Sequence, residues 1–162
     1  MSDIMLYRLA GLSAVAGGLV RIANVFVVSI DPAMLQWDYF VTDVLLLFGL
    51  TGFYLRYRGV AGLAGLAGFA VAAIGILLVR SSRMTGDYRI AAAVTLIGAG
   101  LLGLTLAVKS GPQRAAGLLL VAALAIGIAG AMMPAFAQAS MIAALLFGAG
   151  FAAAGAQLLR AR

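Results

Sequence analysis

The sequence predicts an all-α integral membrane protein with six transmembrane helices arranged as three helical hairpins. Hydrophobic residues make up 65% of the chain and charged residues only 10%, and the mean hydropathy is +1.15. Soluble domains are roughly half apolar and a quarter charged, so this composition indicates a protein that lies in a lipid bilayer. The 162 residues are expected to form one domain, with hairpins over about residues 9–55, 59–108 and 115–159.

Six apolar runs account for the predicted helices. Each is about long enough to cross a hydrocarbon core of roughly 30 Å, which takes about 20 helical residues. The runs are rich in Ala, Leu and Gly and lack the two-residue alternation of a membrane strand, which favours helices. The runs are Leu9–Ile30, Tyr39–Leu55, Gly59–Val79, Ile90–Val108, Ala115–Met133 and Ser140–Leu159. The second could begin earlier, near Leu35, and the first is expected to be a retained span rather than a cleaved signal.

Short polar segments connect these runs. A tight basic turn is expected at Arg56–Arg58, the longest loop at Arg80–Arg89 and a second basic turn at Lys109–Arg114. Asp31-Pro32 is expected to end the first helix, because proline disfavours helix in the residue before it. Trp37, Asp38 and Tyr39 are typical of an anchor at the level of the lipid headgroups.

The distribution of Lys and Arg predicts the orientation. With the N-terminus inside, one side holds Arg8, Arg56, Arg58, Lys109, Arg114, Arg160 and Arg162, whereas the other holds Arg80, Arg83 and Arg89. Basic residues concentrate on the cytoplasmic side of membrane proteins. Both termini are therefore expected in the cytoplasm, with the chain as a multi-pass protein of a bacterial inner membrane.

Composition also excludes several classes of function. The chain has no cysteine and no histidine, which removes disulfides, thiolate metal sites and the commonest haem ligand. The net charge of +6 is spread over the ends of apolar runs, so nucleic-acid binding is not expected. No serine or carboxylate is paired with a base at a spacing that supports hydrolysis. We therefore expect no metal and no cofactor. The composition argues against an enzyme, and an enzyme that acts on lipid stays a third, less favoured hypothesis.

The hairpins resemble one another in sequence. The odd runs open with Arg8-Leu9-Ala10-Gly11-Leu12, Arg58-Gly59-Val60-Ala61-Gly62-Leu63 and Arg114-Ala115-Ala116-Gly117-Leu118, and the even runs carry Phe48-Gly49, Ile97-Gly98 and Phe147-Gly148. Because each unit would have two spans, this pattern predicts a parallel repeat around a pseudo-threefold axis. The glycines are expected to permit close packing of helices.

The candidate functional residues are Arg21, Asn24 and Asp43, which make the first hairpin polar where the other two are apolar. An arginine at membrane depth costs about 2.5–3.5 kcal/mol on insertion scales, so it normally faces protein or water and has a partner. Arg21 is expected to lie roughly 7–8 Å deeper than Asp43, a gap that an extended guanidinium can nearly span. The three residues are predicted to cluster inside the bundle. Their role is either to fix the packing of the hairpin or to bind an anionic or polar group, contact a partner subunit or relay a proton.

Two hypotheses for function follow. The first is a non-catalytic accessory or scaffolding subunit that contacts other membrane subunits, or itself, through its helices. The alternative is a small transporter or binder of a polar, anionic or lipid ligand at Arg21, Asn24 and Asp43. Membrane lipids are expected partners in both cases. Arg80, Arg83 and Arg89 form either a solvated outer loop or a weaker contact site for lipid phosphates or a partner.

Overall fold

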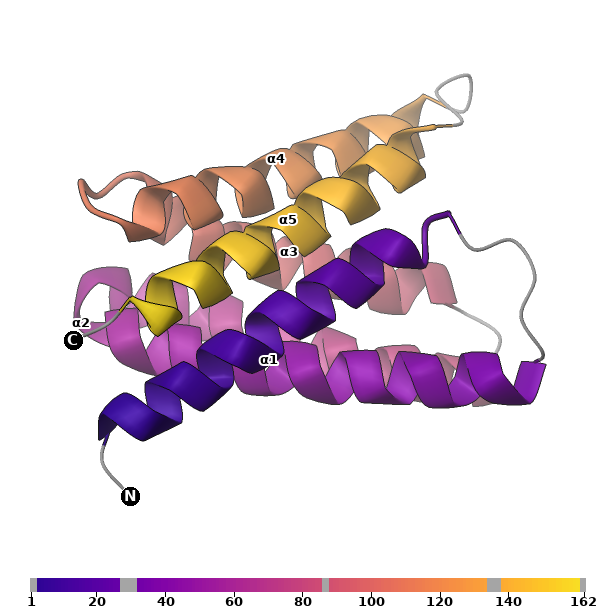
Figure 1. The fold of residues 1–162 in the computed structure, drawn as a ribbon. Coiled ribbons are helices and arrows are strands. Elements are labelled where there is room, and N and C mark those ends of the chain that lie inside the picture. The colour runs from indigo at the N-terminus through magenta and orange to yellow at the C-terminus, as the bar shows by residue number, and fades with distance from the viewer. Residues whose placement is uncertain (1–2, 27–31, 86–87, 134–137, 161–162) are drawn as a thin grey trace.

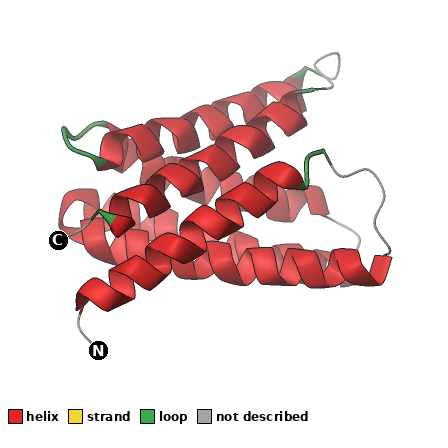
Figure 2. Ribbon diagram, viewed as in Figure 1, coloured by secondary structure: helices red, strands yellow, loops and turns green. Residues whose placement is uncertain are grey.

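Helices joined by turns make up the protein over the residues that the computed structural model describes, which are 3–26, 32–85, 88–133 and 138–160. The side chains of residues 3, 32–36 and 80–85 are outside this description. The helices are α1 (Asp3–Ala23), α2 (Pro32–Thr85), α3 (Tyr88–Ala107), α4 (Gln113–Met132) and α5 (Ala139–Leu159) (Figures 1 and 2). All five are long and apolar enough to cross a membrane. The predicted all-helical, membrane-compatible class is confirmed at that level.

Helix α2 folds back on itself at Gly62. This residue has φ 62° and ψ −160°, a conformation outside the helical region. The rings of Tyr54 and Phe69 stack with their centroids 4.7 Å apart, although a straight helix would separate these residues by roughly 22 Å. Figure 1 shows the two arms of α2, residues 32–61 and 63–85, running back along each other.

The reversal is therefore not at Arg56–Arg58, where a basic turn was predicted. The first arm stays helical beyond these residues, and the Arg56 guanidinium lies 5.6 Å from the centre of the Tyr7 ring in α1. Arginine is a good helix former whose stem packs along apolar surface while its charge reaches water. The chain instead turns at Gly62, because glycine adopts positive φ without the steric cost of a Cβ atom.

Two other boundaries differ from the prediction. The first run was expected to be helical to Ile30, but α1 ends at Ala23. The amide of Phe26 donates to the Ala23 carbonyl, a bond between residues three apart that tightens the last turn. The loop predicted at Arg80–Arg89 is helical up to Thr85 and again from Tyr88.

Consecutive segments pack side by side, and α5 returns to pack on α1. Glycines bring the backbones together: Gly11 faces Gly155 between α1 and α5, and Gly103 faces Gly117 between α3 and α4. Close approach of this kind is how membrane helices associate when lipid is as apolar as their side chains.

The two ends of the bundle differ in charge. The start of α1, the end of α5, the turn between the two arms of α2 and the turn between α3 and α4 all lie at one end (Figure 1). We call this the basic end, because it carries Arg8, Arg56, Arg58, Lys109, Arg114 and Arg160. The half of the bundle nearer this end has a solid core, in which Leu50, Phe53, Leu102, Leu106, Leu120 and Leu158 are almost completely buried.

The glycines that the sequence repeat aligns do not share one environment. Gly11 and Gly117 lie in helices against the backbone of a neighbour, whereas a methyl group added to Gly62 would meet nothing within 4 Å. Gly49 and Gly98 each pack on the preceding segment of their own hairpin, but Gly148 packs on α1. Packing at these positions therefore does not follow the repeat.

Candidate functional site

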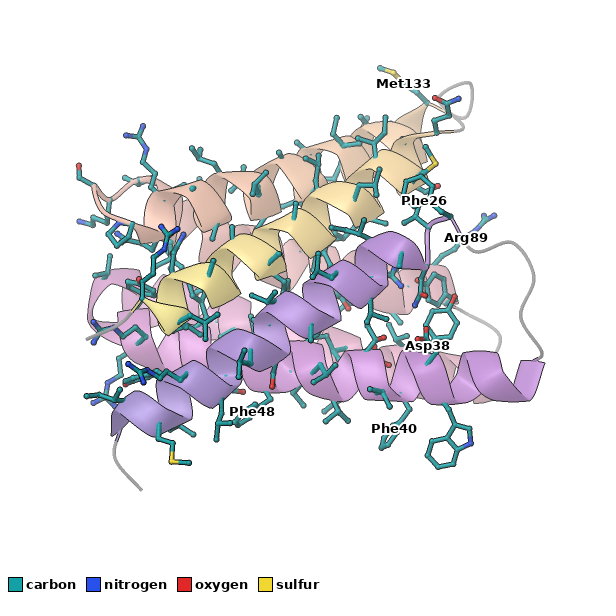
Figure 3. All side chains as sticks on the ribbon, viewed as in Figure 1. Phe26, Asp38, Phe40, Phe48, Arg89 and Met133 are labelled. Carbon is teal, nitrogen blue, oxygen red and sulfur yellow. The ribbon has the colours of Figure 1, made fainter. Side chains whose placement is uncertain are left out.

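Polar side chains tie the helices together at the end opposite the basic end. Asn24 Nδ2 donates to Asp38 Oδ2 at 2.5 Å and joins the residue after α1 to α2. Arg21 Nη2 donates to Tyr88 Oη at 2.9 Å and joins the last turn of α1 to the first residue of α3. Figure 3 labels Asp38 and Arg89, which both lie at this end. We refer to it as the Arg21 end.

Arg21 lies level with Thr42 and Asp43, not deeper than Asp43 as predicted. Ala14 of α1 lies against Gly49, and Gly17 of α1 lies against Leu45 and Leu46. In an antiparallel pair this register places Arg21 beside residues 42 and 43. The prediction assumed a hairpin turning near Met34. The observed register is shifted because α1 ends at Ala23 and α2 already begins at Pro32.

A cavity of about 730 Å³ lies between the helices at this end. Its polar wall consists of Arg21, Asp43, Tyr88, Arg89, Thr95 and Ser140. Its apolar wall extends further into the bundle and includes Leu46, Ile76, Leu96, Leu124 and Phe147. All five helices, including both arms of α2, contribute to the lining. The cavity lies within the usual range for ligand sites, roughly 300–1,000 Å³.

A second, smaller cavity of about 320 Å³ lies beside the first. It is lined by Arg21, Asn24, Val25, Tyr39, Tyr88, Ser140, Met141 and Ala144. Arg21, Tyr88, Ser140 and Ala144 belong to the walls of both cavities. Arg21 therefore shares one cavity with Asn24 and the other with Asp43, while Asn24 forms its hydrogen bond with Asp38.

Of the three arginines predicted to lie in an outer loop, the structure describes the side chain of Arg89. Arg89, in the first turn of α3, is exposed and lines the larger cavity. Arg80 and Arg83 lie in the last turns of α2, but their side chains are outside the described residues.

Asp38, Tyr88 and Ser140 complete the polar end and were not among the predicted site residues. The sequence did place Asp38 in a headgroup-level anchor and Tyr88 in a loop. All three lie near helix ends, where polar residues are common, so they do not stand out in the sequence as Arg21 and Asp43 do inside apolar runs.

The charge of the larger cavity favours an anion. Its charged lining residues are Arg21, Arg89 and Asp43. A guanidinium carries five N–H donors and no acceptor, and Tyr88 accepts from one nitrogen of Arg21. The remaining donors suit a carboxylate or phosphate, which arginine binds in a planar, two-pronged geometry.

Other chemistry has little support at this site. Thr95 Oγ1 donates to the Ala91 carbonyl at 2.9 Å within its own helix. Within the part of the chain that is described, no group of three or more acidic, histidine or cysteine side chains could hold a metal ion. Arginine does not act as a base in proteins. Arg21 and Arg89 can therefore bind an acidic group but cannot take up its proton.

No protein-family model, curated protein or solved structure matches this chain. The function is therefore inferred from the geometry of the chain itself.

Proposed function

We propose that the chain crosses a bacterial inner membrane six times, with both termini in the cytoplasm. The fold-back of α2 at Gly62 supports two crossings by this helix. At 1.5 Å per residue, each arm reaches the roughly 30 Å of a hydrocarbon core. The basic end also holds the start of α1 and the end of α5, and the cytoplasmic side of membrane proteins is the one rich in Lys and Arg.

We further propose that the protein binds an amphiphile with an anionic head and an apolar body. The observation that carries this proposal is the larger cavity, which combines Arg21 and Arg89 with a wall of Leu, Ile, Ala and Phe side chains. A small polar molecule would leave the apolar wall without contacts, and an apolar molecule would leave two arginines on the wall with one carboxylate, that of Asp43. Only a ligand with both parts matches the whole lining.

The solid core at the basic end favours binding over conduction. Leu50, Leu102, Leu106 and Leu158 fill the bundle beyond the cavity and are almost completely buried. This packed core would therefore block a ligand bound at the Arg21 end from passing through the bundle to the basic end. An accessory or scaffolding subunit remains the second proposal. A filled interior would have favoured it, whereas a cavity beside Arg21 favours a binder.

The proposal can be tested with a tryptophan placed at the cavity. The chain has a single tryptophan, Trp37, which is exposed. Phe147→Trp in a Trp37→Phe background puts the only tryptophan on the buried apolar wall. The probe is a fatty acid with a nitroxide near the end of its chain, added to the protein in lipid nanodiscs.

The matched control is Phe53→Trp in the same background, because Phe53 is also buried but lies in the solid core. Its neighbour Gly52 packs on Ala10 of α1, so this site is closer to the basic end than the cavity is. The proposal predicts stronger quenching at position 147 than at position 53. Equal quenching at both positions would mean that the fatty-acid chain stays in the surrounding bilayer, and would contradict the proposal.

A further inference from the structure

We infer that the larger cavity opens sideways to the bilayer between α3 and α4, and that its ligand is an anionic membrane lipid whose hydrocarbon chain enters by this route. This inference rests on the proposed binding function and adds the source of the ligand. It is carried by the residues that belong to the cavity wall and to the outer surface at once.

Those residues lie on α3 and α4. Ile97 of α3 and Ile128 of α4 line the cavity, and both side chains are 50% exposed. Ala93 and Ala131, one turn nearer the Arg21 end, are also exposed lining residues. The cavity therefore reaches the outer surface between these two helices.

The apolar lining residues on the other helices are buried or half-buried, Val79 and Ala144 being the half-buried ones. Leu46 and Ile76 of α2 and Ala143 and Phe147 of α5 line the same cavity but are buried. On these sides a molecule in the bilayer contacts the outer faces of the helices and not the residues that line the cavity.

Glycine packing explains why the gap lies where it does. Near the cavity, the contact of Gly75 with Thr95 joins α2 to α3 with no room for a methyl group, and the contact of Gly130 with Ala139 does the same for α4 and α5. Gly18 and Gly148 bring the backbones of α1 and α5 together in the same way.

Helices α3 and α4 are equally close only toward the basic end, where Gly103 faces the carbonyl of Gly117. Beside the cavity, the nearest neighbour of Gly127 is the tip of the Leu96 side chain, 3.0 Å from the point where a Cβ atom on this glycine would lie. A side chain that can rotate takes the place of the backbone atoms that Gly75 meets in α3 and Gly18 meets in α5. The gap can therefore widen without separating the bundle.

Charge and position indicate which part of the lipid lies where. Arg89 is exposed, lines the cavity and lies in the first turn of α3, beside the gap. Arg21 lies in the last turn of α1 across the cavity. An anionic head, carboxylate or phosphate, can thus bind at the Arg21 end while its chain passes between Ile97 and Ile128 toward Phe147. A lipid already in the bilayer needs no transfer through water to reach this site.

The test measures how fast a bilayer lipid reaches the tryptophan introduced by Phe147→Trp in the Trp37→Phe background. The lipid probe is a phosphatidylglycerol with a nitroxide near the end of one acyl chain, delivered from vesicles to the protein in nanodiscs. A second probe, a short nitroxide-labelled carboxylate that stays in water, reports access from the aqueous side.

The blocking variant is Ile97→Phe with Ile128→Phe. The matched control is Leu104→Phe with Leu118→Phe on the same two helices, because these residues are 51% and 50% exposed and are not part of the cavity lining. We expect the blocking pair to slow quenching by the lipid about tenfold, which corresponds to an added barrier of about 1.4 kcal/mol. The control pair should leave that rate unchanged, and neither pair should slow the water-borne probe.

Lipid quenching that is equally fast in the blocking and control pairs would overturn the lateral route. In that case the binding function still stands if the tryptophan at position 147 is quenched more strongly than the one at position 53, and only the route is wrong. If neither probe quenches the tryptophan at position 147, both the route and the binding function are wrong.

Discussion

Replacing Gly62 with alanine should destabilise the protein, although the added methyl group meets no atom. Gly62 has φ 62° and ψ −160°, and nothing lies within 4 Å of the position its Cβ would take. The cost therefore comes from the backbone alone. Residues other than glycine held in this part of φ/ψ space cost about 1–3 kcal/mol, so Gly62→Ala should lower the free energy of unfolding by that amount.

Gly59→Ala is the matched control, because it lies in the same arm of α2 and also has nothing within 4 Å of its Cβ position. Its φ is that of an ordinary helix residue. Alanine is better than glycine inside a helix by about 0.5–1 kcal/mol. Gly59→Ala should therefore stabilise the protein, and the two variants should differ in sign.

The assay is equilibrium unfolding in mixed micelles, where rising SDS unfolds the helices and circular dichroism follows the loss of structure. Gly62→Ala should shift the midpoint to lower SDS and Gly59→Ala to higher SDS. If both variants stabilise the protein equally, residue 62 is helical. The fold-back of α2, and with it six crossings, would then be refuted.

Three further predictions concern packing and the polar end. Gly98→Ala should lower the free energy of unfolding by about 1–3 kcal/mol, because its methyl group would overlap the backbone of Ala72. If the SDS titration shows no loss of stability, α2 and α3 must lie further apart than this contact requires. Gln157→Leu should raise the midpoint of thermal unfolding, because it removes a buried Oε1 that has no hydrogen-bond partner among the described residues. The expected gain in the free energy of unfolding is about 1 kcal/mol. A lower midpoint would show that this oxygen is hydrogen-bonded. Tyr88→Phe should weaken binding of the nitroxide fatty acid by about 2- to 10-fold, because Arg21 Nη2 loses the hydroxyl to which it donates at 2.9 Å. Unchanged affinity would mean that this hydrogen bond does not position Arg21.

The sequence predicts the helices well because their signal is compositional. Long apolar runs without alternation leave helices as the structures that satisfy every backbone group in lipid. The position of the reversal in α2 is harder to predict. The chain has 21 glycines, and among the described ones only Gly62 and Gly111 have positive φ. Gly111 precedes a proline, which marks a turn, whereas Gly62 stands in a run of helical glycines with no such neighbour.

The site was predictable in part for a related reason. Arg21 is conspicuous as a charge in an apolar run, and the structure places it on the walls of two cavities. Its partner Tyr88 is 67 residues away in sequence, and a contact of that kind depends on the arrangement of the helices. The depth of Arg21 relative to Asp43 depended on where α2 begins, and helix ends are the least certain part of a sequence-based prediction.

The central claim is that Arg21 binds the anionic head of an amphiphile whose chain occupies the larger cavity. The most direct test compares the affinity of wild type and Arg21→Gln for two nitroxide probes with the same chain, one ending in a carboxylate and the other in a hydroxyl. A hydrogen bond to a charged group contributes about 1.5–3 kcal/mol, so the variant should bind the carboxylate at least about tenfold more weakly. Its affinity for the alcohol should be unchanged. Equal affinity of both proteins for the carboxylate, or an equal loss for both probes, would contradict the claim.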